Sequence, residues 1–430
     1  MSLLMSEMKK HINTYKELTK DKDIKEIKTL DFVNIPLINM TSTNYELDVQ
    51  IGDKVKIGTQ IGHRNDHFYV PFFSSVSGEV VEVKKIMHSS LKPVDHLVIK
   101  NDFKEEKAYL PAIDINSATR SELLDFTKNA GIVGCGGAGL PSYIKFSSEN
   151  NHTLIINAVE CEPYITADDF NIKHHQDLFI LGLKAVLKMT NVEKVILTFK
   201  DYKKGQDKTK LRSLLDDVKD IVNTEVRFVE NAYPMGWERS LVFGVTHKRY
   251  DRLPTELGLI VSNITTIIAL GDAMMNRLPI VDKIVTFAGD GIKENTNVLV
   301  KVGVSVKNVI ENLGGYTAEE IKLIAGGPMM GKTILKDEFV ITPYTNGITI
   351  LKNNNIESIN CLHCGRCIDH CPSGLQPVLI VNAGKVKDHT LLEKLNVSDC
   401  IECGLCTYVC PSRIKVTEGI RVAKRAAKSV

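Results

Sequence analysis

Long hydrophobic runs and an excess of charge of one sign are both missing from this 430-residue sequence. No apolar run reaches the roughly 18 residues of a membrane-spanning helix. The formal net charge is only +2, so the composition does not predict a nucleic-acid-binding surface. The first 28 residues are charged throughout and lack the apolar core of a secretory signal. We therefore expect a cytoplasmic protein with no transmembrane segment and no nucleic acid partner, although docking on a membrane complex stays open.

Cysteine is also scarce, yet eight of the ten cysteines fall into two copies of one pattern. "CLHCGRCIDHCP" (361–372) and "CIECGLCTYVCP" (400–411) both read C-x2-C-x2-C-x3-C-P, the run of two-cluster ferredoxins, in which the fourth cysteine ligates the other [4Fe–4S] cluster. A zinc site, the alternative, typically uses two CxxC pairs. The expected ligands are Cys361, Cys364, Cys367 and Cys410 for one cluster, and Cys400, Cys403, Cys406 and Cys371 for the other.

The length and the local patterns predict several domains. Residues 1–30 predict a polar helix or arm. Two strand–turn–strand patterns, turning at Gly52-Asp53 and at Ser77-Gly78, predict a barrel-sandwich domain of the lipoyl type over 31–107. Its tip carries no lysine, so a structural domain is favoured over a swinging arm.

Strands and helices alternate over 115–284, which predicts a Rossmann-like α/β domain with a largely parallel sheet. The rest of the chain predicts a β-grasp-like module over 285–347, a two-cluster ferredoxin domain over 351–415 and a basic tail helix over 416–430. In the β-grasp region, Ser305 caps one expected helix and Thr317 with Glu320 forms a capping box for a second. The other expected elements are helices over 118–130, 168–189 and 208–222, and strands over 153–158, 194–199 and 225–229.

The stretch "GIVGCGGAGLPSYIKF" (131–146) is rich in glycine and opens a predicted helix at Pro141. Without Cβ atoms, such a loop lets a large ligand lie against bare backbone, and free N–H groups of a helix start bind phosphate. The spacing is neither a Walker loop nor a strict dinucleotide fingerprint. Binding of a nucleotide or flavin phosphate is favoured over a tight structural turn. The candidate residues are Gly134, Gly136, Gly137, Ala138, Gly139 and Lys145.

Polar groups also follow the predicted strands, where ligands bind in open α/β sheets. Each of these loops alone could be an ordinary solvated loop. Together they predict one polar rim, because parallel strands end at the same edge. The candidates are Asn157, Glu160, Glu162, Gly236, Glu238, Asn263 and Thr266.

Four motifs, GxGGAGxPxxxK, NAxExEP, YPxGxE and GGPMMG, resemble the RnfC family, the C subunits of Rnf complexes. That family is similar to the flavin- and NADH-binding subunit of respiratory complex I. The resemblance covers about 31–415 and implies the domain series given above, an FMN cofactor, NADH as substrate and two [4Fe–4S] clusters. It also implies that the glycine-rich loop, Asn157, Glu160, Glu162, Gly236 and Glu238 contact flavin or dinucleotide, and that Asn263 and Thr266 lie where the flavin phosphate is contacted.

The sequence also departs from the family pattern. We find no HGGxHPxxxK opening and no long C-terminal extension, and both favour a soluble relative such as the electron-transfer protein associated with D-proline reductase. Cys135 stands where relatives usually carry leucine or arginine. Near a helix start, its pKa could be lowered and the thiol redox-active; the alternative is a small apolar filler. We take Glu162 and Cys135 as the candidate catalytic residues.

The fold class expected is therefore multidomain α/β. The expected function is that of a soluble NADH-dependent oxidoreductase that passes electrons through FMN and two clusters to a partner reductase, with D-proline reductase as the first candidate. A homo-oligomer is compatible with the sequence. Two alternatives remain: an electron-input subunit of an Rnf-type membrane ion pump, and a flavin-free relay module that only binds a partner and passes on its electrons.

Overall fold

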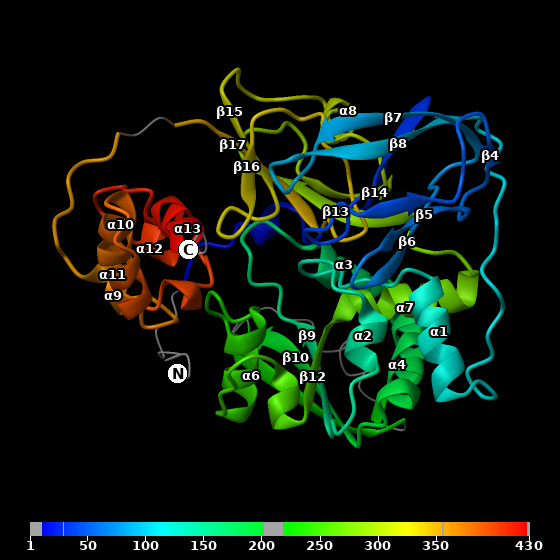
Figure 1. Ribbon diagram of the computed structural model, residues 1–430, viewed down its shortest axis with the longest axis horizontal. Coiled ribbons are helices and arrows are strands. Elements are labelled where there is room, and N and C mark those ends of the chain that lie inside the picture. The colour runs from blue at the N-terminus through cyan, green and yellow to red at the C-terminus, as the bar shows by residue number, and fades with distance from the viewer. Residues whose placement is uncertain (1–10, 29, 202–217, 220, 355–356, 428–430) are drawn as a thin grey trace.

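The computed structural model describes residues 11–28, 30–201, 218–219, 221–354 and 357–427. Figure 1 shows an α/β domain at the bottom, two β-rich domains side by side above it, and a small helical domain at the left. The helical domain is joined to the rest by a long loop. Among the described helices, none is long and apolar enough to cross a membrane.

The α/β domain, called the flavin domain below, is built on a parallel sheet with the strand order β11-β10-β9-β12. This is half of the Rossmann strand order, with the reversal next to β9. The three expected strands are confirmed as β9 (Thr153–Ala158), β10 (Lys194–Asp201) and β11 (Asn223–Glu230), and β12 (Leu259–Asn263) completes the sheet.

Helices cover both faces of this sheet, with α6 on one side and α1, α4 and α7 on the other (Figure 1). Thr119 caps α1 through a capping box with Glu122, as predicted. The single helix expected over 168–189 is wrong, because the backbone of His175 leaves the helical region and separates α3 from α4. The helix expected over 208–222 lies mostly outside the described residues. The helical bounds are α1 (Arg120–Asn129), α2 (Ser142–Phe146), α3 (Ala167–His174), α4 (Gln176–Thr190), α6 (Glu238–Thr246), η2 (Pro254–Leu257) and α7 (Ile264–Asn276).

The barrel-sandwich domain consists of two antiparallel sheets, β2-β8-β7-β4 and β3-β5-β6. Both predicted hairpins are wrong in their pairing. β4 pairs with β7 rather than with the strand before it, and β6 and β7 lie in different sheets. The chain thus crosses between the sheets where a turn was expected. The strands are β2 (Phe32–Pro36), β3 (Tyr45–Leu47), β4 (Lys54–Val55), β5 (Gln60–Asn65), β6 (Tyr69–Phe73), β7 (Gly78–Met87) and β8 (Pro93–Asn101).

The second β-rich domain has the strand order β14-β13-β17-β15-β16, with β13 and β17 parallel in the middle. This is the β-grasp arrangement that the sequence predicted. Ser305 caps α8 as expected. The capping box at Thr317 and Glu320 is wrong, since a strand, β15, follows it. The elements are β13 (Asp282–Ala288), β14 (Thr296–Lys301), α8 (Val306–Asn312), β15 (Ile321–Ala325), β16 (Lys332–Ile334) and β17 (Gly347–Lys352).

One continuous hydrophobic core joins the barrel-sandwich domain to the β-grasp domain. Val33, Ile61 and Val80 of the barrel belong to the same buried cluster as Val285 and Phe287 of β13. Burying one apolar face against the other stabilises both domains, because each sheet alone would leave a face in water. The two domains are therefore expected to unfold together.

Of the predicted polar helix or arm, the described residues 11–27 form the arm. It contains one short 3-10 turn, η1 (Lys16–Leu18), and a short strand, β1 (Lys25–Glu26). β1 pairs with β14 in parallel and extends the β-grasp sheet. The arm therefore belongs to the folded body of the protein.

The ferredoxin domain is a small helical unit that includes the predicted tail helix. Val416, Ile420 and Ala423 of that helix are buried against Ile380 and Leu392. The tail helix is thus a structural part of this domain rather than a free basic tail. The helices are α9 (Arg366–Asp369), α10 (Pro377–Lys385), α11 (His389–Lys394), η3 (Val397–Asp399), α12 (Leu405–Tyr408) and α13 (Val416–Ala427).

A buried histidine makes the barrel-sandwich domain sensitive to acid. Nδ1 of His88 accepts the backbone N–H of Ser90 at 3.1 Å, while its Nε2 is buried with no hydrogen-bond partner in the described chain. Burial lowers the pKa of His88 to about 4 from the usual 6.5. Because the unfolded chain takes up the proton first, stability falls as the pH drops below 6.5. We expect a loss of about 2 kcal/mol by pH 5 from this residue.

The His88→Leu variant tests this expectation. Its urea midpoint should change less between pH 7.5 and pH 5 than that of the unsubstituted protein. An equal pH dependence in the two proteins would show that His88 is not held neutral by burial.

Candidate functional site

The glycine-rich loop lies against the start of α7 and presents bare backbone to solvent. Gly136, Gly137 and Ala138 are exposed. The loop is held from behind, because Cys135 N–H donates to Thr266 Oγ1 at 2.9 Å and Asn39 Nδ2 donates to the Gly139 carbonyl at 2.9 Å. These contacts fix the loop at the carboxyl edge of the sheet.

The exposed part of the loop fits the phosphate-bearing end of a flavin. No hydrogen bond within the described chain uses the backbone N–H groups of residues 136–139. A Cβ atom at Gly137 would meet nothing within 4 Å, so space is open in front of the loop. Successive free N–H groups form a concave anion-binding surface. This arrangement is compatible with a nucleotide or flavin phosphate, and the binding role of the loop stays a prediction.

Cys135 does not have the environment that was expected of it. Its side chain is completely buried, and its Sγ donates to the Val133 carbonyl at 3.4 Å. Burial raises the pKa of the thiol, with Lys283 opposing this and Asp168 adding to it. The expected lowering of the pKa is therefore wrong. A thiol held protonated away from solvent matches the filler alternative.

Asp168 organises the rim beside the loop, although sequence reasoning missed it. Its carboxylate accepts from Asn263 Nδ2 and from Thr265 Oγ1, both at 2.7 Å. Asn263 in turn caps α7 by accepting the N–H of Thr265 at 2.9 Å. Asn263 and Thr266 thus hold the helix start and the loop in place rather than standing free. The two adjacent acidic residues Asp168 and Asp169 were the only feature of the sequence that could have marked this position.

The remaining predicted polar residues of β9, α2 and α6 meet at the same rim. Asn157 Nδ2 donates to the Gly236 carbonyl at 2.9 Å. Lys145 Nζ donates to the Val261 carbonyl at 2.7 Å and lies 3.8 Å from a Glu238 carboxylate oxygen. Burial lowers the pKa of Lys145, and Glu238 opposes that shift. The predicted convergence of strand-end loops is therefore present in the structure.

Gly236 is needed for close packing at this point. A Cβ atom there would lie 2.0 Å from the Val159 carbonyl oxygen and 2.9 Å from Cys161 Sγ. Only glycine lets the two loops approach to this distance. Cys161 is buried, and burial raises the pKa of its thiol to about 11.

The acidic loop, residues 159–166, carries two buried carboxyl groups that point in different directions. Glu160 Oε2 lies 3.1 Å from Lys16 Nζ of the N-terminal arm. Glu162 accepts the backbone N–H groups of Met329 at 3.2 Å and Met330 at 2.8 Å. Glu162 thus binds the GGPMMG motif of the β-grasp domain. Burial raises the pKa of each carboxyl to about 7.

The two cysteine runs repeat the same backbone conformation. Gly365 and Gly404 have φ values of 77° and 80°, and His363 and Glu402 have φ values of 52° and 56°. The ends of the runs are crossed. Ile359 N–H donates to the Ser412 carbonyl at 3.1 Å, which brings the residues after Cys410 next to the start of the first run.

Cys371 of the first run lies with the three leading cysteines of the second. Burial raises the pKa of the Cys403 thiol, and the neighbouring Cys406, Cys371 and Cys400 raise it further. Burial likewise raises the pKa of Cys406 to about 12, with Cys400 and Cys371 adding to it. Across the described residues, no three acidic, histidine or cysteine side chains are close enough to hold a single metal ion. Four thiolates around a four-iron core stand farther apart than the ligands of a single ion, and the thiols must be deprotonated to bind it.

The second cysteine run faces the flavin domain. Tyr233 is buried and donates its hydroxyl to the Cys403 carbonyl at 2.7 Å. Cys161, Tyr233, Cys403 and Leu405 form one apolar cluster. A Cβ atom at Gly404 would lie 2.5 Å from the Met329 carbonyl, which shows how closely the GGPMMG motif approaches. Sequence reasoning missed Tyr233, because no local pattern marks a contact between domains.

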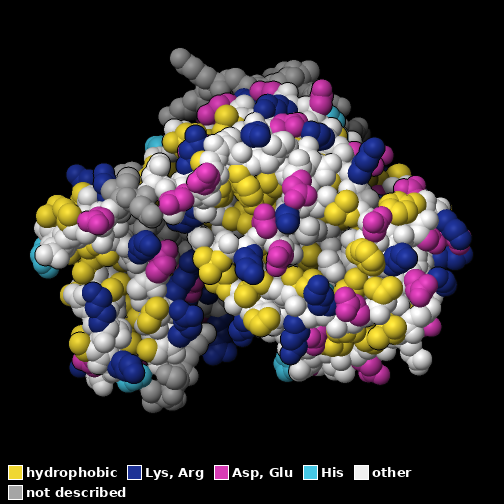
Figure 2. All heavy atoms as spheres, turned by 90° about the horizontal axis from the view of Figure 1, so that it is seen from above, with side chains coloured by type: hydrophobic (Ala, Val, Ile, Leu, Met, Phe, Trp, Pro, Cys, Tyr) yellow, Lys and Arg dark blue, Asp and Glu magenta, His cyan; other side chains and the backbone are white. Residues whose placement is uncertain are grey.

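The first cysteine run faces outward. Cys364 is exposed, as are Leu362 and Ile368 on either side of it. Figure 2 shows this domain as a separate lobe at the left, divided from the body by a deep indentation and carrying exposed yellow side chains among dark blue ones. The two candidate cluster sites therefore differ in their surroundings: one is enclosed at the domain contact and the other lies near solvent.

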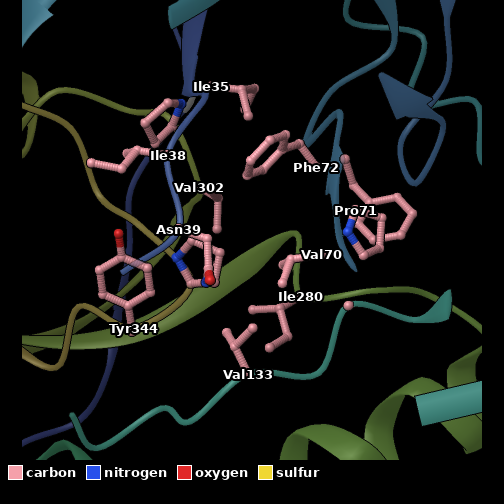
Figure 3. Close-up of a pocket in the computed structure, with 14 residues that line it drawn as sticks. Ile35, Ile38, Asn39, Val70, Pro71, Phe72, Val133, Ile280, Val302 and Tyr344 are labelled. Carbon is pink, nitrogen blue, oxygen red and sulfur yellow. The ribbon is translucent and has the colours of Figure 1, made fainter. Parts of the chain in front are cut away.

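A small cavity lies behind the glycine-rich loop, toward the barrel-sandwich domain (Figure 3). Its volume is about 40 Å³, and its lining includes Ile35, Phe72, Val133 and Tyr344. This space holds a water molecule or two but not a flavin. The candidate flavin face is therefore the open side of the loop.

Three segments of the chain match known protein families. Residues 10–104 match the RnfC barrel sandwich hybrid domain, residues 127–272 the Nuo51 FMN-binding domain, and residues 353–411 the 4Fe-4S dicluster domain. The chain therefore carries an FMN-binding domain and a domain for two 4Fe-4S clusters, as predicted.

Relatives resemble the chain over most of its length. The C subunit of the Na(+)-translocating ferredoxin:NAD(+) oxidoreductase complex of Acetobacterium woodii is 33% identical over 387 residues, which cover 88% of this chain and 86% of that protein. The C subunit of the proton-translocating ferredoxin:NAD(+) oxidoreductase complex of Clostridium ljungdahlii is 32% identical over 426 residues, covering 96% and 92%.

A solved structure shares the fold. The H2-reduced NAD+-reducing [NiFe]-hydrogenase gives a TM-score of 0.50 at 15% identity, covering 74% of this chain and 62% of the hydrogenase chain. The identity to the two relatives above extends over the barrel-sandwich, flavin, β-grasp and ferredoxin domains together. The chain belongs to the RnfC family, the C subunits of Rnf complexes, and is an electron-transfer protein of the oxidoreductase class.

Proposed function

We propose that this chain exchanges electrons with NAD(H) as a subunit of an Rnf-type complex. The relatives named above are subunits of ferredoxin:NAD(+) oxidoreductase complexes, which supports this assembly over D-proline reductase as the partner. On this proposal the chain works at a membrane complex through partner subunits rather than as a free cytoplasmic protein.

One observation carries the proposal: the enclosed cysteine site touches the rim of the flavin domain. Tyr233 belongs to the YPMGWE loop of that rim, and its hydroxyl binds the backbone of Cys403. A cofactor on the rim and a cluster at Cys403 would therefore be neighbours. The other cysteine site, around Cys364, lies outward, where a partner can approach.

Different residues of the rim have different roles in cofactor binding. The free N–H groups of residues 136–139 bind the phosphate, and Thr266 and Asn263 hold these groups in place. When bound, FMN supplies the conversion between two-electron and one-electron transfer, and the clusters carry single electrons. Glu160 and Glu162 can hold or release a proton near neutral pH, because burial raises the pKa of each to about 7.

An anaerobic titration tests the proposal. The protein is reconstituted with iron, sulfide and FMN, and NADH is added while the visible spectrum is recorded. We expect bleaching of both flavin and cluster absorbance. If NADH leaves the spectrum unchanged while dithionite bleaches the clusters, the flavin-free relay is the better description.

A second measurement separates the two assemblies. Affinity purification of the tagged chain from detergent-solubilised membranes is expected to recover Rnf-type membrane subunits. Recovery of proline reductase from the soluble fraction, with none of those subunits, would favour D-proline reductase as the partner.

A further inference from the structure

The N-terminal arm lies along the acidic loop of the flavin domain. Tyr164 N–H donates to the Thr14 carbonyl at 2.7 Å, and the rings of Tyr15 and Tyr164 stack at 4.8 Å. The hydroxyls of Thr19 and Thr166 lie 2.8 Å apart. Contacts on both sides of Lys16 therefore fix where its side chain enters the protein.

Lys16 inserts its ammonium group into the acidic loop. The residue is 7% exposed, its Nζ lies 3.1 Å from Glu160 Oε2, and it also donates to the Ile165 carbonyl. The other oxygen of Glu160 accepts the backbone N–H of Asp168 at 3.1 Å. Glu160 therefore joins the arm to the start of α3.

Asp168 continues this chain of contacts to the glycine-rich loop. Its carboxylate binds Asn263 and Thr265 at the start of α7, and the next residue, Thr266, accepts the N–H of Cys135. Each of these hydrogen bonds is 3.1 Å or shorter and joins buried or half-buried groups. The path leads from the arm to the free N–H groups of the glycine-rich loop.

Lys16 supplies a positive charge in direct contact with the buried acids of this path, and the buried Lys200 lies near Glu160 as well. Burial and the neighbouring Asp168 raise the pKa of Glu160, and Lys16 opposes both effects. Lys16 also acts on Glu162 and Lys200. Removing one partner of a buried ion pair leaves the other charge uncompensated, which drives local rearrangement.

We propose that Lys16 is a positioning residue for the flavin site. Through its ion pair with Glu160, it holds Asp168 and the start of α7 in the arrangement that presents the N–H groups of residues 136–139. The identity of the ligand rests on the proposed function, whereas the positioning itself does not. A segment outside the flavin domain thus completes the binding face of that domain.

Hydrogen exchange on the ligand-free protein tests the positioning directly. The backbone amides of Cys135 and Asp168 donate hydrogen bonds along the path, so their exchange rates report on it. Lys16→Met is expected to speed both by about 10-fold or more, while Lys16→Arg, which keeps the charge, restores much of the protection. Lys20→Met is the matched control, because Lys20 is exposed and lies 3.7 Å from Asp21 on the surface.

Exchange in β7 and β8 of the barrel-sandwich domain separates a local from a global effect. These strands should exchange alike in all four proteins. Unchanged exchange at Cys135 in Lys16→Met would overturn the proposal, and so would faster exchange that is uniform across the protein.

Flavin binding gives a second readout that does not depend on activity. FMN is titrated into cluster-loaded, flavin-free protein, and quenching of its fluorescence gives the Kd. We expect Lys16→Met alone to raise the Kd about 10-fold. Added to the Glu160→Gln variant, Lys16→Met should change the Kd little further, because both substitutions break the same contact. Additive effects would contradict action through Glu160.

The two proposals can fail separately. If the unsubstituted protein binds no FMN, the proposed function fails, and hydrogen exchange still decides the role of Lys16. If Lys16→Met does not fold, the charge-free pair Lys16→Met/Glu160→Gln takes its place. That pair should fold with fast exchange at Cys135, and protection equal to the unsubstituted protein would overturn the proposal.

Discussion

Replacing Cys371 with serine is expected to remove the cluster of the second cysteine run, although Cys371 belongs to the first. The structure places Cys371 beside Cys400, Cys403 and Cys406. A cubane needs four thiolates, and serine is a poor substitute for a soft sulfur ligand. Iron content should fall to about half, with the remaining cluster on Cys361, Cys364, Cys367 and Cys410.

Cys410→Ser is the matched variant. It should also lose about half of the iron, but from the outward site. Cys135→Ala is the control, because Cys135 is completely buried in the flavin domain and the iron content of that variant should equal that of the unsubstituted protein.

The two ligand variants should differ sharply in their response to NADH. The enclosed site touches the flavin domain through Tyr233, whereas Cys364 of the outward site is exposed. NADH should therefore still bleach the cluster that remains in Cys410→Ser, while in Cys371→Ser the remaining cluster should respond only to dithionite. Electron paramagnetic resonance of the reduced proteins checks this. The opposite pattern would show that the outward site is the one nearer the flavin.

The domain for two 4Fe-4S clusters could be predicted from sequence because each cysteine run is a local pattern. In each run, four cysteines and a proline fix the path of the chain within about a dozen residues, and the backbone angles at Gly365 and Gly404 repeat accordingly. The crossed ligation was predicted from the known pattern of two-cluster ferredoxins, and the position of Cys371 beside the second run agrees with it. The sheet of the flavin domain was likewise predictable, since its buried strands are continuous apolar runs.

Pairing between strands was less predictable. The alternation around Ser77 marks strands on both sides, but around Gly52 only Lys54–Val55 forms a strand. Alternation also says nothing about the partner of a strand. In the structure, β4 pairs with β7 of its own sheet, a strand that begins more than 20 residues later. Similarly, the capping pattern at Thr317 and Glu320 precedes a strand, because pairing with β17 outweighs a weak local helix preference.

The members of the site could be predicted, but the contacts between them could not. Glu162 was expected to face the flavin, yet its carboxylate binds Met329 and Met330 of another domain. Lys16 lies 144 residues before its partner Glu160, and no local pattern links a charged arm to one buried acid. Cys135 shows the same limit, since burial decides the state of its thiol and burial is a property of the whole fold.

Replacing Gly137 with valine is expected to abolish tight flavin binding while leaving the fold intact. A Cβ atom at Gly137 meets nothing within 4 Å, and its backbone is not in the left-handed region that favours glycine. The added methyl groups would occupy the open space in front of the loop. Overpacking of this kind costs about 1–3 kcal/mol, or about 5- to 150-fold in Kd.

Gly236→Ala provides the contrast, because there the new Cβ atom would meet the Val159 carbonyl oxygen at 2.0 Å. That variant should lose thermal stability, since the backbone of two packed loops must move. Without ligand, Gly137→Val should unfold at the same thermal midpoint as the unsubstituted protein. Adding FMN should raise the midpoint of the unsubstituted protein but not that of Gly137→Val. Should Gly137→Val bind FMN as tightly as the unsubstituted protein, the open side of the glycine-rich loop is not the flavin face. Binding would then have to use the rim beside Glu160 and Asn157 without the free N–H groups of the loop.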